Sequence, residues 1–95
     1  MGANWTDRRV VVTGLGVVTP LGHDVETFWQ NLLAGKCGVE RISAFDAANF
    51  ATQVAAEVRG FNPLPAFPSA KEVRRTDRYS QFGIYAAHQS LLDSG

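Results

Sequence analysis

The chain has 95 residues, of which 45% are apolar, and its nine Lys and Arg residues balance its nine Asp and Glu residues, so the formal net charge is zero at pH 7. This balance gives no electrostatic footprint for nucleic acid, and no apolar run approaches the ~20 residues that cross a bilayer. One cysteine excludes an internal disulfide and a metal site built from cysteines, and no secretory pattern opens the chain, so the expected location is the cytoplasm.

A glycine-interrupted apolar run comes first. The β-branched residues from Val10 onward predict a strand buried on both faces, as in the parallel sheets of α/β proteins, with Gly14 and Gly16 in the turn that follows. The turn does not match the dinucleotide-binding fingerprint, because Thr19 occupies the third small-residue position and a proline follows it. It does not match a phosphate-binding loop either, because no Gly-Lys pair stands at the required spacing.

The clearest helix is predicted over Asp24 to Ala34. Asp24 is a good N-cap, Gly35 is suited to end the helix, and apolar residues recur at helical spacing between them. Among those residues we expect Phe28 and Trp29 to pack in a core.

The middle of the chain is predicted to be mostly irregular. Gly38 to Phe50 lacks periodicity and is expected to wrap the surface, with Phe45 and Phe50 as anchors and Asp46 starting a turn. Alternating apolar residues predict a second strand over Thr52 to Val58. Three prolines then make Phe61 to Pro68 a stiff connection without a helix.

Two helices are predicted in the last third. The order Ser69-Ala70-Lys71-Glu72 is a capping box that starts a short helix, and Asp77 caps a second helix, or a bent continuation, that runs to about Ser94 before Gly95. One face of the second helix carries small residues at positions i, i+3, i+4 and i+7, which lets another backbone approach closely. These residues are Gly83, Ala86, Ala87 and Ser90.

Few residues suggest chemistry. His23 and His88 have no visible partner, Glu72 and Asp77 are explained as caps, and Glu26 and Glu40 stand without an evident partner. One basic group remains, which the spacing i, i+3, i+4 and i+7 places on one side if the helix continues through Asp77. Its members are Lys71, Arg74, Arg75 and Arg78. The plain interpretation of such a group is a solvated helix face.

Several segments together point to a family. They are Val10 to Gly22, Phe28-Trp29, Leu32 to Lys36, Phe45-Asp46, Ala55 to Val58, and Arg74 to Tyr79. In order and spacing this set resembles the opening of a stand-alone, elongating β-ketoacyl-acyl carrier protein synthase. Modular polyketide synthase domains are similar, but they usually have a Met-Gly-Cys-Arg-Phe-Pro type of sequence where this chain has Leu15 to Pro20.

The resemblance implies a fold and a reaction. The fold would be the N-terminal part of a thiolase-like, layered α/β/α/β/α sandwich, with residues 1–95 forming an incomplete N-terminal portion of a ketoacyl synthase domain. The whole enzyme would be an acyltransferase of fatty acid biosynthesis that joins an acyl chain, held on cysteine, to malonyl-acyl carrier protein by decarboxylative Claisen condensation. Family members are usually homodimers and need no metal or dissociable cofactor.

The resemblance also assigns the candidate residues. The family's catalytic cysteine and two histidines belong to motifs beyond Gly95, so none of Cys37, His23 and His88 is expected to be catalytic, and Cys37 is interpreted as a structural or incidental thiol. The family binds its acidic carrier protein with basic residues of the corresponding helix. Their counterparts here are Lys71, Arg74 and Arg75. Arg78 is left out of this docking site because it is expected to turn inward.

Two other kinds of protein remain open at this stage. A non-catalytic chain-length factor, the ketosynthase-like partner in aromatic polyketide assembly, is similar over this region. A short protein that only binds a partner is the second alternative.

Overall fold

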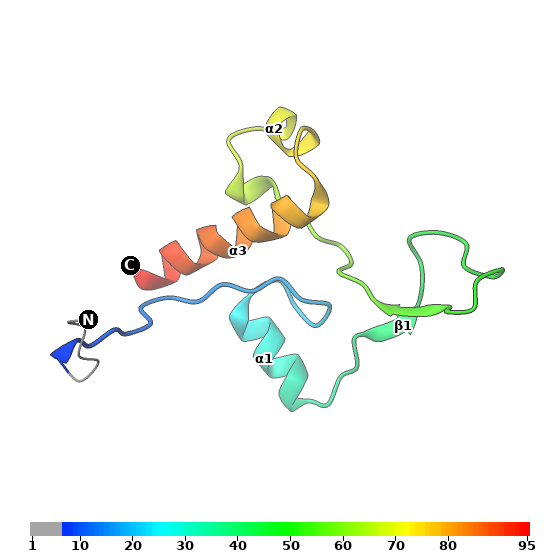
Figure 1. The fold of residues 1–95 in the computed structure, drawn as a ribbon, viewed down its shortest axis with the longest axis horizontal. Helices are drawn as coiled ribbons and strands as arrows, with labels where there is room; N and C mark the ends of the chain where they lie inside the picture. The colour runs from blue at the N-terminus through cyan, green and yellow to red at the C-terminus, as the bar shows by residue number, and fades with distance from the viewer. Residues whose placement is uncertain (1–6) are drawn as a thin grey trace, which may run out of the picture.

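The computed structural model describes residues 7–95, in which three α-helices, a two-stranded sheet and the 3-10 turn η2 follow one another along the chain (Figure 1). In chain order the elements are α1 (Val25–Leu33), β1 (Val39–Arg41), β2 (Val54–Ala56), the 3-10 turn η2 (Leu64–Ala66), α2 (Ala70–Arg74) and α3 (Arg78–Ser94).

Helix α1 has the ends that the sequence predicts. Asp24 is extended at the N-cap, and its Oδ1 accepts a hydrogen bond of 2.7 Å from the backbone N–H of Thr27. After the C-cap at Ala34, Gly35 has a φ of 73°, in the left-handed region where glycine is favoured. The expected core role of Phe28 and Trp29 is only partly seen, because Phe28 is half-buried whereas Trp29 is 54% exposed within the described chain.

The prediction of a buried strand from Val10 onward is wrong for the described structure. This segment has no strand, and Val10 is 89% exposed. A strand is defined by hydrogen bonds to a neighbouring strand, and Figure 1 shows this stretch running beside α3 without one. This segment therefore has the β-branched composition of a strand, but the described residues offer no neighbouring strand with which it pairs.

The sheet of the described residues is an antiparallel hairpin instead. β1 and β2 pair with Val39 opposite Ala56 and Arg41 opposite Val54. The strand predicted over Thr52 to Val58 is confirmed in a shorter form, but the irregular interpretation of Gly38 to Phe50 missed β1, whose three residues are too few to show a periodicity.

The loop of the hairpin folds back on itself. Asp46 starts a turn as predicted, because its Oδ1 accepts from the N–H of Ala48 at 3.1 Å. The rings of Phe45 and Phe50 meet edge to face at 5.6 Å, and Ala47 between them is the one buried apolar residue of the described chain.

The proline-rich connection contains one helical turn, contrary to the prediction of a connection without a helix. η2 begins after Pro63, and Asn62 Oδ1 accepts from the N–H of Leu64 at 3.1 Å. Proline is compatible with the start of a helical turn, since the first N–H groups of such a turn have no internal acceptor.

The capping predictions for the last third are confirmed for the helix starts and for Ser69, whereas no capping bond from the Glu72 carboxylate is present in the described chain. Ser69 Oγ accepts from the N–H of Glu72 at 3.4 Å at the start of α2. Asp77 occupies the N-cap position of α3, although its side chain makes no capping bond, and Gly95 ends that helix with a φ of 91°.

The small-residue face of α3 receives the glycine-rich turn, as its composition predicts. A Cβ at Gly14 would lie 2.1 Å from the carbonyl oxygen of Ser90, and one at Gly16 would lie 1.9 Å from that of Ala86. Both positions therefore require glycine for close backbone packing and not for binding a phosphate. Gly83 has open space instead, so only part of the face is used.

The described chain exposes much apolar surface. Its accessible area is 7391 Å², whereas a compact chain of this mass has about 5,400 Å². Its radius of gyration is 17.6 Å, against ~12 Å for a compact domain of this length. Exposed apolar side chains occur from Val10 to Val12, on α1 and at the end of α3.

Candidate functional site

The basic residues singled out from the sequence lie on and just after α2. Lys71 and Arg74 are in the helix, and Arg75 is its C-cap. The condition for one continuous stripe through Arg78 is not met, because α2 ends at Arg74 and Arg78 begins a separate helix, α3. The break is stabilised locally by Thr76, whose Oγ1 donates to the carbonyl of Glu72 at 2.7 Å.

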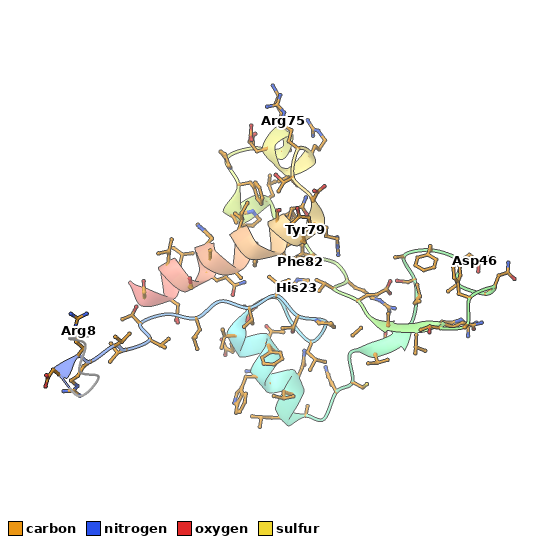
Figure 2. The ribbon with its side chains drawn as sticks, viewed as in Figure 1. Arg8, His23, Asp46, Arg75, Tyr79 and Phe82 are labelled. Carbon is orange, nitrogen blue, oxygen red and sulfur yellow. The ribbon has the colours of Figure 1, made fainter. Side chains whose placement is uncertain are left out.

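This short segment carries three positive charges and one negative charge, that of Glu72. All three basic side chains are exposed, and Arg75 reaches Glu72 only loosely, with 3.9 Å between the Nη1 and Oε1 atoms. Among residues 7–95, Lys71 and Arg74 have no carboxylate within ion-pair distance. Figure 2 shows Arg75 extending away from the rest of the chain. The segment is thus a free cationic surface suited to an acidic partner.

Arg78 turns toward other groups of the chain, as the sequence predicts, although the residue stays exposed. Its Nη2 donates to the carbonyl of Val58 at 2.5 Å, and its guanidinium carbon lies 5.1 Å from the centre of the Phe82 ring. These contacts engage its charge with the chain's own backbone and an aromatic face. Arg78 is therefore not part of the free cationic surface.

The two histidines do not form a catalytic group in the described chain. His23 does have a neighbour, contrary to expectation, but it is the aromatic ring of Phe61, at 5.3 Å edge to face. Phe61 also meets Phe82 and Tyr85, at 5.1 and 5.0 Å, so His23 belongs to an aromatic cluster (Figure 2). Within residues 7–95, no three His, Cys, Asp or Glu side chains gather as metal ligands would.

Cys37 lies exposed in the loop after α1. Its Sγ is 3.8 Å from the carbonyl oxygen of Val39, a weak contact with the first residue of β1. This setting agrees with the interpretation of an incidental thiol.

The sequence missed one charged cluster, which is centred on Arg59. The guanidinium binds Glu40 and Glu57, the latter at 2.9 Å, and donates to the carbonyl of Arg41 at 2.7 Å. Glu40 therefore has a partner, and Glu26 also has one, since it accepts from Gln30 at 3.4 Å. Glu57 and Arg59 both follow β2, so no strand pattern marks the pair, and the contact of Arg59 with Glu40 joins residues 19 positions apart.

Glu57 is the most strongly perturbed acid of the described chain. Its carboxylate accepts from the N–H of Ser43 at 3.0 Å, from Arg59, from the Ser43 hydroxyl at 2.9 Å and from the N–H of Ala44 at 3.1 Å. These donors stabilise the charged form, and they lower the pKa of Glu57 to about 2, with the Ser43 N–H contributing most. The carboxylate thereby joins the end of β2 to the chain that leaves β1.

Replacing Glu57 by Gln is expected to lower the melting temperature of the complete protein near neutral pH, with an effect that shrinks as the pH falls. The folded-state pKa of about 2 is below the ~4.3 of an unfolded glutamate, so the stabilisation is full above about pH 4.3 and is lost as the pH falls through about 2. Thermal unfolding across this range measures it, with Glu26→Gln as control. A Glu57→Gln difference that persists undiminished at about pH 2 would contradict the assignment.

A known structure supports the class of fold. The chain superposes on the ishigamide ketosynthase/chain length factor with a TM-score of 0.82 at 34% sequence identity, covering 93% of this chain and 22% of that chain. The described helices and hairpin thus correspond to part of that ketosynthase/chain length factor, and the fold class is thiolase-like α/β.

The family follows from the sequence comparison. Residues 7–95 match the description "Beta-ketoacyl synthase, N-terminal domain", and the chain belongs to this family. Over 88 residues it is 54% identical to 3-oxoacyl-[acyl-carrier-protein] synthase 2 of Coxiella burnetii and 47% identical to the Vibrio cholerae protein of the same name. The Staphylococcus aureus (strain COL) protein of that name is 38% identical. Each alignment covers 93% of this chain, which spans about a fifth of each relative, 21%.

Between Asp7 and Gly95, no helix combines the length and apolar character that a membrane crossing requires.

Proposed function

We propose that residues 1–95 are the N-terminal portion of a ketoacyl synthase domain, and that the whole enzyme is a 3-oxoacyl-acyl carrier protein synthase of fatty acid biosynthesis. This acyltransferase would join a cysteine-bound acyl chain to malonyl-acyl carrier protein by decarboxylative Claisen condensation. The family match over residues 7–95 carries the proposal. The relatives named 3-oxoacyl-[acyl-carrier-protein] synthase 2 support its reaction and substrates.

In this proposal the described residues bind the carrier and leave the chemistry to other parts of the enzyme. Lys71, Arg74 and Arg75 contact the acidic carrier protein through their exposed charges. The carbon nucleophile comes from decarboxylation of the malonyl group, so the reaction needs no metal or dissociable cofactor. We further propose a homodimer in the cytoplasm, a reducing compartment with which the single thiol agrees.

The proposed reaction is tested with the complete enzyme. Incubated with an acyl-carrier protein and malonyl-carrier protein, it is expected to release carbon dioxide and form a 3-oxoacyl-carrier protein in equal amounts. Failure to load a labelled acyl group, or carbon dioxide release without a carbon–carbon bond, would contradict the proposal.

A second candidate is favoured by one observation, since the solved structure on which this chain superposes is that of a ketosynthase/chain length factor. A chain length factor would be a non-catalytic partner of a ketosynthase. The same assay separates the candidates, because such a partner would load no acyl group by itself and would act only when a catalytic ketosynthase is added.

Replacing Cys37 by Ser is expected to leave turnover of the complete enzyme within about twofold of wild type. The thiol is exposed in a loop, and its one hydrogen bond in the described chain is a weak one to the carbonyl of Val39, so its loss removes little stability and no catalytic group. Steady-state condensation rates and acyl-enzyme burst amplitudes provide the measurement. A labelled acyl group recovered on Cys37, or a lost burst in the variant, would overturn this assignment.

A further inference from the structure

Helix α2 is too short to keep its own orientation. It has five residues, Ala70–Arg74, and isolated helices shorter than ~12 residues are marginal in water. The last carbonyls of a helix also lack donors within the helix. Contacts from outside must therefore hold the segment that displays the three basic side chains.

The side chain of Gln81 provides such contacts. Its Nε2 donates to the carbonyl of Val73 at 3.1 Å and to that of Thr76 at 2.9 Å, which joins the first turn of α3 to the end of α2. Gln81 is half-buried, and its own backbone N–H donates to Asp77 at 2.9 Å. The Gln81 side chain is thus attached to an ordered part of the backbone, and its amide group donates both hydrogen bonds to the end of α2.

Helix α3 is itself bound to another part of the chain at Arg78, about one helical turn before Gln81. The bond from Arg78 to the Val58 carbonyl joins the start of α3 to the segment that follows β2, and the Phe82 ring lies under the guanidinium. In Figure 1, α2 stands away from α1 and the hairpin. Among residues 7–95, the hydrogen bonds that reach the end of α2 from beyond Asp77 come from Gln81.

We infer that Gln81 is a positioning residue for carrier recognition, which holds Lys71, Arg74 and Arg75 in the orientation that the acidic partner meets; this inference rests on the proposed function. Gln81 itself is not a carrier contact. Its effect is preorganisation, because a segment that must be ordered during binding reduces affinity.

The test uses Gln81→Met in the complete enzyme, a change that keeps side-chain length and removes both donors. Two net hydrogen bonds correspond to roughly fivefold or more in affinity. We therefore expect KM for malonyl-carrier protein to rise at least about fivefold, while kcat/KM for malonyl-coenzyme A, which does not use the docking surface, stays within about twofold.

A second glutamine of α3 gives a matched control. Gln89 also bonds backbone carbonyls, those of Val17, at 3.2 Å, and His23, but these belong to the glycine-rich turn and not to α2. Gln89→Met is expected to lower stability and to affect both malonyl substrates equally. If Gln81→Met behaves in the same way, or changes neither substrate, the inference is wrong.

Two further variants keep the outcome decisive. If Gln81→Met does not accumulate as folded enzyme, Gln81→Asn retains an amide that is one methylene too short for the two carbonyls, and it is expected to show the same KM split. Replacing the three basic residues by Glu tests the proposed function separately. If that change leaves carrier KM unaltered, the docking proposal and this inference both fail; if it raises KM but neither Gln81 variant does, only the inference fails.

Discussion

Residues 1–95 expressed alone are expected to show neither a cooperative thermal transition nor any condensation of malonyl thioesters. The described chain buries a single apolar residue, Ala47, and exposes side chains such as Val10, which is 89% accessible. Hydrophobic burial is the main favourable term in folding and must offset a conformational entropy cost of ~1–2 kcal/mol for each ordered backbone residue. So little burial leaves that cost largely uncompensated.

Circular dichroism during heating and the dispersion of amide resonances measure the structural half of this prediction, with the complete enzyme as the cooperative control. A sharp transition together with well-dispersed resonances in the isolated chain would show that it folds alone. Acyl transfer by the isolated chain would contradict the assignment of the catalytic cysteine to another part of the enzyme.

Changing Lys71, Arg74 and Arg75 together to Glu is expected to weaken carrier binding by the complete enzyme roughly tenfold or more. Exposed ion pairs contribute ~0.2–1 kcal/mol each, and the reversed charges add repulsion. Because the proposed docking would act by charge, most of the loss is expected in the association rate, and the loss should shrink at high salt, where the Debye length falls to ~3 Å at 1 M.

Stopped-flow binding and condensation assays at two salt concentrations test this expectation. Malonyl-coenzyme A bypasses docking and should react normally with the triple variant. Lys71→Glu alone can be matched with Lys36→Glu, a reversal at an exposed lysine in the loop after α1, which should leave carrier affinity unchanged. Equal losses with carrier-bound and carrier-free substrates would contradict the proposed docking, as would a wild-type carrier affinity that does not change with salt. Either result would show that the basic residues form only a solvated helix face.

The sequence by itself was sufficient for the features that are decided within a turn or two of chain. Asp24 and Gly35 predicted the ends of α1, and Ser69 predicted the start of α2, because a cap depends on the residue itself and on an N–H or carbonyl three or four positions away. The order of motifs along the chain likewise predicted the family that the comparison confirmed.

Only the tertiary structure decided which partners the longer-range groups find. Val10 lies in a run with strand composition but has no neighbouring strand in the described chain, and a ladder cannot form without one. Glu40 and Arg59 meet across 19 positions, and Gln81 reaches back eight positions to Val73 across the break between two helices. Such contacts depend on how the intervening chain turns in space, which no local periodicity encodes.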